Sequence, residues 1–292
     1  MEKKILITGA SGGFGKLTVE TLLKSGHKVV GTMRTTTGRN QKVANELTNA
    51  GAQLIEMDVT SNQSVEAGVH KAIELLGGLD VVINNAGVGV SGMVEHFTPE
   101  DMQKIFDINV VGVQRVNRAA LPFLRKQGKG TIIYISSLLG RFTLPFYGVY
   151  NASKWALEAL AENYRTELSG FGIESCIVEP GGFPTTFNAN LVTPSDDSRN
   201  EAYGDFMQAP IAAGQAFGEA LENNKEQRPQ KVADALADLL EQPFGERPFR
   251  TIVDYMGMGD HIKGYNEKLH AVTNGIYSAF GTQGMLEVKL NS

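Results

Sequence analysis

The stretch Lys4-Ile5-Leu6-Ile7-Thr8-Gly9-Ala10-Ser11-Gly12-Gly13-Phe14-Gly15 decides the fold of this chain. Its first part is a short apolar run typical of a buried strand, and its second part is a glycine-rich turn before a predicted helix at 16–24. Glycines let the backbone approach a pyrophosphate, while a helix N-terminus offers free N–H groups and a positive dipole end. In this context the stretch predicts a dinucleotide-binding loop, whereas the glycines alone would indicate only a tight turn.

Strands and helices continue to alternate along the chain. The predicted strands lie at 27–32, 53–57, 79–83, 131–135, 173–178 and 250–254. The predicted helices lie at 40–50, 64–75, 99–127 (with a kink expected at Pro122), 150–169, 229–240 and 260–272. This alternation predicts a parallel, doubly wound α/β sheet of the Rossmann-like type. We expect a single domain over 1–292, with a substrate-side loop or lid at 183–230 and a C-terminal extension at 256–292.

Glycines and polar residues follow most of the predicted strands. In a parallel sheet, ligands bind beyond the carboxyl ends of the strands, so these residues are expected to share one site. They are Thr8-Gly9, Met33-Arg34, Asp58, Asn84-Asn85, Ser137 and Pro180-Gly181.

The end of the second strand bears on the choice of cofactor. An acidic residue there suits a free ribose 2′-hydroxyl, and an arginine suits a 2′-phosphate. No acidic residue occurs between Val29 and Asn40, whereas Arg34 and Arg39 do. The sequence therefore favours NADP, with NAD as the alternative; the two arginines could equally be solvated loop charges.

Tyr150 and Lys154 lie four residues apart, which places them on one face of a helix that Tyr150 would open. A nearby ammonium group favours the phenolate and is expected to lower the pKa of Tyr150 from about 10. Such a tyrosine is a candidate general acid–base. Ser137 follows a predicted strand and could direct its hydroxyl to the same place. Alone, the pair could also be an ordinary solvated helix face.

Composition excludes several classes of protein. A net charge of −5 and a pI near 5.6 argue against nucleic-acid binding. Cys176 is the single cysteine and lies in an apolar run, and the five histidines lack ligand spacing, so no metal site is predicted. No apolar run approaches the roughly 20 residues of a membrane span, and the N-terminus lacks the pattern of a signal peptide. We expect a cytoplasmic chain with no membrane partner.

Together, the motifs resemble those of the classical short-chain dehydrogenases/reductases. They are Thr8-Gly9-x-x-x-Gly13-x-Gly15, Asn84-Asn85-Ala86-Gly87, Ser137 and Tyr150-x-x-x-Lys154, in the family's order. The separation of 150 − 137 = 13 residues between the serine and the tyrosine is typical of the family. The resemblance covers roughly residues 3–185 and the strand near Arg250.

The resemblance implies a role for each matching residue. Tyr150 would be the proton donor in carbonyl reduction, and Lys154 would hold the nicotinamide ribose and lower the pKa of Tyr150. Ser137 would bind the substrate oxygen, and Asn109 would support a proton relay. The implied cofactor-binding set, with Arg34 added from the argument above, is Gly9, Ser11, Gly13, Phe14, Gly15, Arg34, Asp58, Val59, Asn85, Ala86, Gly87, Tyr150, Lys154, Pro180, Gly181 and Thr185. Gly12 stands where many NADP-using relatives carry a basic residue.

The expected activity is hydride transfer between a nicotinamide cofactor and a small ketone, aldehyde or secondary alcohol. Aromatic and apolar residues near the expected site suggest an apolar or aromatic substrate: Phe142, Leu144, Phe146, Phe183 and Phe187. A cofactor-binding regulator or scaffold of the same fold is one alternative, and an epimerase or dehydratase of the superfamily is another. A homodimer or homotetramer is expected from the resemblance.

Overall fold

The computed structural model describes residues 1–290. Its centre is a seven-stranded sheet in the order β3-β2-β1-β4-β5-β6-β7, in which every pair is parallel. The predicted Rossmann-like α/β fold is therefore confirmed. The strands are β1 (Lys4–Ile7), β2 (Lys28–Met33), β3 (Gln53–Glu56), β4 (Val81–Asn84), β5 (Gly130–Ile135), β6 (Ile173–Pro180) and β7 (Arg250–Val253).

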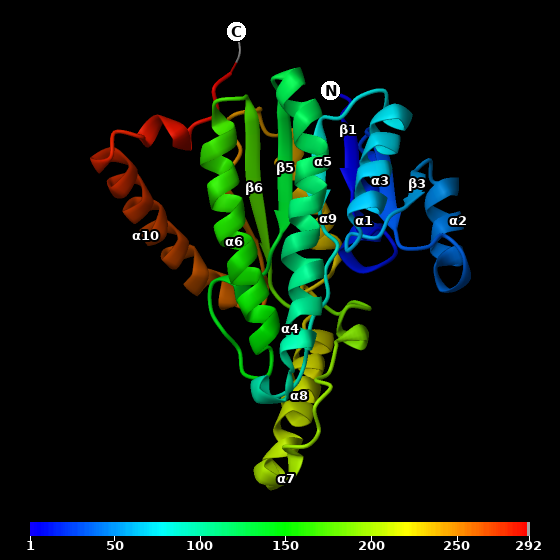
Figure 1. Cartoon of the computed structure of the whole chain (residues 1–292), viewed down its shortest axis with the longest axis vertical. Coiled ribbons are helices and arrows are strands. Elements are labelled where there is room, and N and C mark those ends of the chain that lie inside the picture. The colour runs from blue at the N-terminus through cyan, green and yellow to red at the C-terminus, as the bar shows by residue number, and fades with distance from the viewer. Residues whose placement is uncertain (291–292) are drawn as a thin grey trace.

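The five inner strands are largely buried on both faces, which explains their apolar sequences, whereas the edge strands β3 and β7 are only partly buried. Side chains alternate between two cores: Ile5 and Ile7 pack with the helices at 13–24, 41–49 and 230–241, whereas Leu6 packs with those at 62–76, 112–127 and 148–169. Figure 1 shows the two helical layers around the sheet. The helices are α1 (Gly13–Lys24), α2 (Gln41–Asn49), α3 (Asn62–Leu76), α4 (Pro99–Phe106), α5 (Gly112–Gln127), α6 (Gly148–Ser169), α7 (Asn200–Tyr203), α8 (Ala209–Asn223), α9 (Gln230–Glu241) and α10 (Met258–Ala279).

Helix boundaries differ from the sequence prediction in ways that affect the site. Helix α1 starts at Gly13 instead of residue 16, so the last glycines of the loop form its first turn. Helix α6 starts at Gly148, so Tyr150 lies within its first turn and does not open it. Between α4 and α5, Asp107–Val111 forms a π-helical turn that contains Asn109. The irregularity expected at Pro122 therefore lies about three to four helical turns earlier in the chain, and Pro122 lies inside α5.

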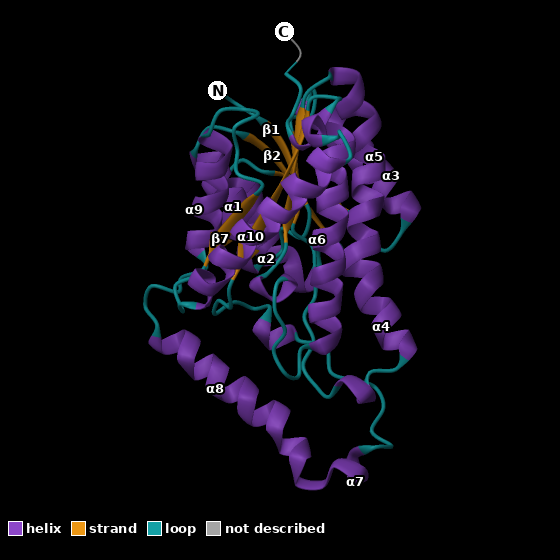
Figure 2. Cartoon of the chain, turned by 90° about the vertical axis from the view of Figure 1, so that its left-hand side faces the viewer, coloured by secondary structure: helices purple, strands orange, loops and turns teal. Residues whose placement is uncertain are grey.

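Two late segments depart from the compact core. The 183–230 segment includes α7 and α8, which project away from the body beyond the carboxyl ends of the strands (Figures 1 and 2). Helix α10 is longer than predicted and contacts β7, and Figure 1 shows it leaning away from α6 on the left-hand side of the molecule. Residues 183–230 and 256–290 thus each contain helices of their own.

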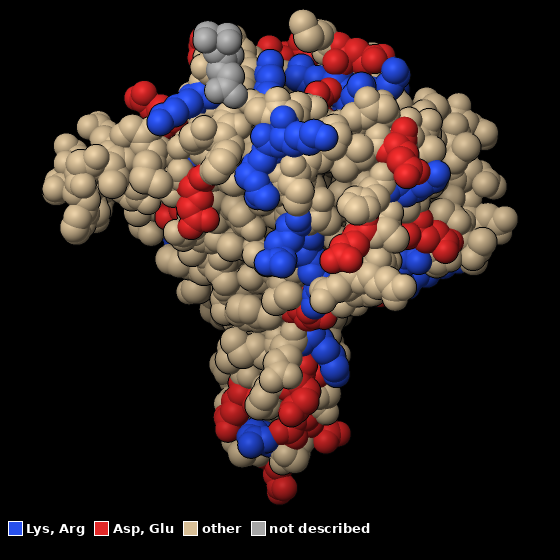
Figure 3. Space-filling model, turned by 45° about the horizontal axis from the view of Figure 1, so that its top comes forward, with Lys and Arg blue, Asp and Glu red and all other residues tan. Residues whose placement is uncertain are grey.

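The molecular surface mixes charges of both signs. Figure 3 shows Lys and Arg side chains interspersed with Asp and Glu on the upper face of the body, and acidic side chains along the projecting segment below it. Within residues 1–290, no helix combines the length and apolar character that a membrane crossing requires.

Candidate active site

The glycine-rich loop forms a backbone cradle at the carboxyl end of β1. Gly9 has a φ of 73°, and a Cβ atom there would lie 2.9 Å from Ala86 Cα. A Cβ atom on Gly15 would lie 2.2 Å from the carbonyl oxygen of Gly9. Side chains at either position would therefore push the loop open. The glycines keep the backbone tight and free of side chains, which is the geometry that close approach to a pyrophosphate requires.

The loop is fixed to the end of the neighbouring strand β4. Thr8 Oγ1 accepts hydrogen bonds from the backbone N–H groups of Asn85 and Ala86, each at 3.0 Å. Asn85 Nδ2 donates to the carbonyl oxygens of Thr8 and Gly9 at 2.9 and 3.1 Å. The two predicted motifs thus form one structural unit at the point where the strand order reverses, which is where such sheets bind dinucleotides.

The N-terminus of α1 faces the segment that follows β6. Gly12 precedes the helix with an extended φ of 177° and provides no side-chain cap, so the first N–H groups of the helix are left for a ligand. Thr185 lies 3.8 Å from the position of a Cβ atom on Gly13. Phe14 packs edge-on against Phe183, with 5.5 Å between ring centroids.

The ends of β2 and β3 carry the predicted adenosine contacts. Arg34 is exposed, and its charge contributes to holding the pKa of Asp58 below its usual range, although hydrogen bonds from Thr60 are the main cause. The carbonyl oxygen of Val59 accepts from Arg115 at 3.0 Å, so this residue anchors the turn. Sequence reasoning missed Glu56, whose Oε1 accepts from the backbone N–H of Thr36 at 2.7 Å and thereby shapes the loop after Arg34.

Tyr150 and Lys154 meet in a buried space at the end of β5. Both side chains are less than one-tenth exposed, and Lys154 Nζ lies 5.5 Å from the centroid of the Tyr150 ring. The ammonium group donates to the carbonyl oxygen of Ile135 at 2.8 Å. Ser137 lies close enough to Tyr150 to act on the pKa of its phenol, so the three predicted residues do converge.

The pKa of Tyr150 is shifted in the opposite direction from the one that the sequence predicted. Burial raises the pKa of the Tyr150 phenol well above its usual value, and only Ser137 opposes this. Burial also lowers the pKa of Lys154 to about 8, against the attraction of Glu158. The i,i+4 spacing predicted the pairing, but the cost of charging groups in a dry environment is the larger effect here.

Ser137 and Asn109 are held by backbone contacts. Ser137 Oγ accepts from the N–H of Leu139 at 3.1 Å and donates to the carbonyl oxygen of Pro180 at 3.5 Å. Asn109 Oδ1 accepts from the N–H of Val88 at 2.9 Å, and its Nδ2 donates to Ser153 Oγ at 3.0 Å. The π-helical turn thus places Asn109 against the α6 turn that carries Tyr150 and Lys154.

The residues at the carboxyl end of β6 form one side of the site. Gly181 donates to the carbonyl oxygen of Val253 at 2.9 Å, and a Cβ atom on it would lie 2.2 Å from Asp254 Oδ1. Pro180 is buried beside Ser137 through the hydrogen bond described above. The tight packing on β7 fixes the path of the backbone on this side of the site.

The predicted aromatic residues do not form one group. Phe187 packs edge-on against Tyr150 at 5.8 Å, whereas Phe183 is buried against Phe14. Phe146 has a φ of 70°, a rare conformation for a residue with a side chain, and it packs against Phe206 of the 183–230 segment at 6.2 Å. Leu144 and Phe146 line a surface depression, together with Val94, Thr143, Pro145, Gly148, Asn151, Ala152 and Trp155.

The 183–230 segment is fastened near the site by contacts that sequence reasoning missed. Asp101 Oδ2 accepts from both the N–H and the Oγ of Ser195, at 3.0 and 2.6 Å, and these bonds lower the pKa of Asp101 to about 2. Glu95 pairs with Arg199 at 3.2 Å and accepts from Tyr203 at 2.6 Å. No sequence signal links these residues, because they lie about a hundred positions apart.

Asp101→Asn is expected to loosen this fastening. A hydrogen bond to a charged group contributes about 1.5–3 kcal/mol, so tryptic cleavage after Arg199 should accelerate about tenfold. Asp107→Asn, which removes an exposed partner of Arg115, should leave that cleavage unchanged. The pKa of Asp101 is lower in the folded protein than in the unfolded chain. The stabilisation that Asp101 gives to the 183–230 segment is therefore complete above the unfolded pKa of about 4, and it is lost as the pH falls toward the folded pKa of about 2. Equal cleavage of both variants at neutral pH would contradict the role of Asp101.

No metal-binding chemistry emerges from the described residues. Within residues 1–290, no group of three or more His, Cys, Asp or Glu side chains is placed to hold a metal ion. Cys176 is buried, and burial raises the pKa of its thiol to about 12, which makes it a poor nucleophile.

Known proteins resemble this chain in sequence and in fold. The sequence model of the family described as short chain dehydrogenase matches residues 3–196. A 3-ketodihydrosphingosine reductase of Bacteroides thetaiotaomicron is 40% identical over 201 residues, which make up 69% of this chain and 71% of that protein.

Two solved structures resemble the chain and carry nicotinamide cofactors. A short-chain dehydrogenase/reductase of Burkholderia phymatum, in complex with NAD, has a TM-score of 0.72 at 25% identity, over 86% of this chain and 89% of its own. An alcohol dehydrogenase of Thermococcus sibiricus, complexed with 5-hydroxy-NADP, has a TM-score of 0.67 at 26% identity, over 86% of this chain and 96% of its own.

Proposed function

Because the chain belongs to the short-chain dehydrogenase family and is an NAD(P)-dependent oxidoreductase, we propose that it is a carbonyl reductase or alcohol dehydrogenase that favours NADPH. The convergence of Ser137, Tyr150 and Lys154 beside the glycine cradle carries this proposal. A regulator or scaffold has no chemical need for all three groups. The spacing of the glycines from Thr8 to Gly15 and the presence of the Asn84–Gly87 motif also favour a reductase over an epimerase or dehydratase.

Each side chain has a distinct role in this proposal. The nicotinamide supplies the hydride chemistry when bound. Tyr150 donates a proton to the carbonyl oxygen, and Ser137 donates a hydrogen bond to the same oxygen. Lys154 binds the ribose and adds a positive charge that favours the phenolate left after proton transfer. Asn109 holds the α6 turn through Ser153 and supports the return of a proton.

The cradle fits a nucleotide pyrophosphate, since Gly9 and Gly15 leave no space for side chains and the α1 N-terminus has no side-chain cap. The remaining predicted contacts, Ser11, Gly13, Phe14, Asp58, Val59, Asn85, Ala86, Gly87, Pro180, Gly181 and Thr185, lie at or next to the same strand ends. NAD and NADP share every feature recognised by this set, so the preference between them depends on Arg34.

Arg34→Ala is expected to raise the Kd for NADPH about tenfold or more and to change the Kd for NADH less than about twofold. An arginine–phosphate pair is a charge-assisted interaction that NADH cannot make. Arg125→Ala, which removes an exposed arginine from the last turn of α5, is the control. Fluorescence titration of both nucleotides measures the effect, and equal losses for NADPH and NADH would remove the argument for NADP.

The substrate is proposed to be apolar or aromatic. Phe187 lies against Tyr150, and Phe146 is held in a rare backbone conformation against Phe206 of the 183–230 segment. Strained residues of this kind concentrate at ligand clamps. We further propose a cytoplasmic homodimer or homotetramer in which α4, the π-helical turn and α6 provide an interface, supported by exposed Met102, Val111 and Trp155.

The deciding experiment is titration of purified protein with NADPH and NADH, followed by a panel of ketones and aldehydes. The panel should include 3-ketodihydrosphingosine, after the name of the Bacteroides relative. Tight NADPH binding with turnover would support the proposal. Binding without turnover of any member of a broad panel would favour the regulator, and binding of neither nucleotide would overturn the proposal.

A further inference from the structure

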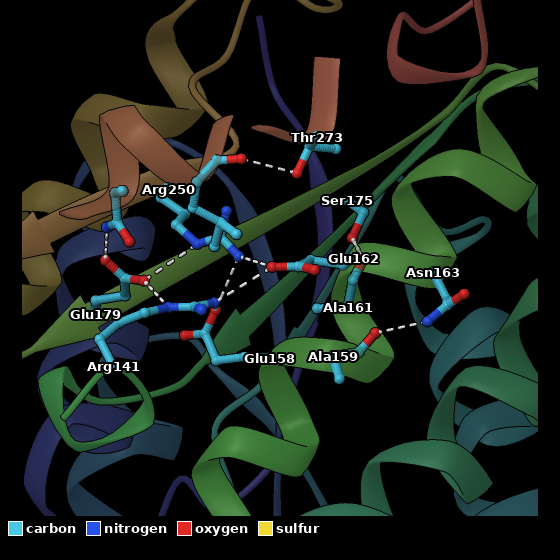
Figure 4. A network of polar contacts seen from close by, with 12 residues as sticks. Arg141, Glu158, Ala159, Ala161, Glu162, Asn163, Ser175, Glu179, Arg250 and Thr273 are labelled. Atoms are coloured by element: carbon cyan, nitrogen blue, oxygen red, sulfur yellow. Dashed lines mark hydrogen bonds and ion pairs between the residues drawn. The ribbon is translucent and has the colours of Figure 1, made fainter. Parts of the chain in front are cut away.

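A largely buried cluster of five charged side chains includes two residues of α6, the helix that carries Lys154 (Figure 4). Arg141 Nε donates to Glu179 at 3.1 Å, and its Nη2 donates to Glu158. Arg250 Nη2 contacts the same Glu158 oxygen at 3.3 Å and also donates to Glu162. The side chains of Arg141, Glu158 and Glu179 are 4%, 2% and 0% exposed. This arrangement places the Glu158 carboxylate between two guanidinium groups, which Glu179 and Glu162 also contact.

The cluster is attached to the site through the chain itself. Arg141 follows Ser137 by four residues, across the short 3₁₀ turn Leu138–Gly140. Glu158 follows Lys154 by four residues on α6, which places the two side chains on one helix face. The C-terminal extension also takes part, because Asn266 of α10 donates to Glu179 at 2.6 Å.

Packing fixes the position of the Glu158 carboxylate. A Cβ atom on Gly140 would lie 3.0 Å from Glu158 Cγ, so the 3₁₀ turn is pressed against this side chain. Glu158 Oε1 has no hydrogen-bond partner among the described residues, whereas Oε2 meets both arginines. A buried carboxylate is costly unless it is paired, and the two arginines provide the pairing. Its negative charge therefore has one fixed location.

Lys154 has few other charged or titratable neighbours. On its own helix it faces Tyr150, from β5 it meets the carbonyl oxygen of Ile135, and the Asn109 and Gly87 region contributes no charge. Burial lowers the pKa of Lys154, and Glu158 is the charge that opposes this effect.

We propose that Glu158 is a positioning residue that keeps Lys154 in its ammonium form, and that Arg141 and Arg250 hold the Glu158 carboxylate for this task. Burial raises the pKa of Glu179 above the usual carboxyl range, with Glu158 as a further cause and the two arginines opposing it.

The inference rests on the proposed function, in which Lys154 binds the cofactor ribose. Loss of its proton removes a hydrogen-bond donor and an attraction for an anionic nucleotide. Ionisation of Lys154 therefore sets the alkaline limit of nucleotide binding.

The test is the Kd of NADPH as a function of pH, from about 6.5 to about 9.5, for wild type, Glu158→Gln and Glu162→Gln. Removing the Glu158 charge should move the alkaline weakening of binding downward by about one pH unit, with Kd unchanged at the acidic end. Glu162→Gln is the matched control, because Glu162 lies one turn further on α6, contacts the same arginines and is 38% exposed. Its profile should coincide with that of wild type.

Glu158→Gln leaves two arginines with fewer counter-charges, which can destabilise the fold. A double variant that keeps the charges balanced makes the test independent of this effect. Glu158→Gln with Arg250→Gln removes one charge of each sign and should show the same downward displacement. Glu158→Asp, which keeps the charge, should restore the wild-type profile. Profiles of the double variant that coincide with wild type would overturn the inference and leave the proposed function standing. A wild type that binds neither NADPH nor NADH would contradict both.

Discussion

Tyr150→Phe is expected to lower the rate of carbonyl reduction by about a thousandfold or more, because no other described group is placed to donate the proton beside Ser137 and Lys154. General acid catalysis contributes about 10²- to 10⁴-fold, and an aromatic ring without its hydroxyl cannot supply it. The Phe ring retains the edge contact with Phe187, so the fold should persist. Steady-state kinetics with NADPH and the best ketone of the panel measure the loss.

Nucleotide binding separates this effect from structural damage. The Kd of NADPH should change less than about twofold in Tyr150→Phe, since the removed hydroxyl acts on the substrate. Tyr164→Phe is the matched control: it removes a hydroxyl from the same helix, one that donates to Gln114 at 2.6 Å, far along α6 from the site. Its turnover should match wild type. Retained turnover in Tyr150→Phe would refute the acid–base role.

Gly15→Ala is expected to weaken nucleotide binding by about a hundredfold or more and to lower Tm. The added methyl group would lie 2.2 Å from the Gly9 carbonyl oxygen and 2.6 Å from Asn85 Nδ2. Backbone has to move to relieve such an overlap, and the hydrogen bonds from Asn85 to Thr8 and Gly9 would be lost with it. Nucleotide titration and thermal unfolding measure the two consequences.

Gly12→Ala provides the matched control in the same loop. Its φ of 177° is accessible to any residue, and the new methyl group would meet only Thr186 Oγ1 at 3.1 Å, which a side-chain rotation can relieve. Binding should weaken by less than about threefold. If Gly15→Ala bound NADPH as tightly as Gly12→Ala, the loop would not be the pyrophosphate cradle.

The sequence predicted the fold well because its signals are local. Buried parallel strands are short apolar runs, and glycine turns and helical stretches separate them in a regular order. Helix ends were less accurate. Helix α1 begins inside the glycine loop, and the π-helical turn at Asn109 has no signal comparable to a proline. Such boundaries depend on which backbone groups find partners in the folded chain.

The candidate site was predicted as a set of residues but not as an electrostatic environment. Ser137, Tyr150 and Lys154 do meet. The pKa of Tyr150 moves in the opposite direction from the one expected, because burial is the main influence on it and only Ser137 opposes burial. Burial depth is a property of the whole packed molecule, so a spacing of four residues could not reveal it.

By itself, the sequence determined the succession of strands and helices, the glycine loop and the identities of the residues at the strand ends. Each of these features depends on a few adjacent positions in the chain. Tertiary structure alone decided the pairing of Asp101 with Ser195 and the clamp of Arg141 and Arg250 on Glu158. These partners lie up to 94 residues apart, and the clamp on Glu158 forms where packing of the folded chain excludes water. Desolvation makes an ion pair or a phenol behave differently there, and desolvation is a consequence of packing.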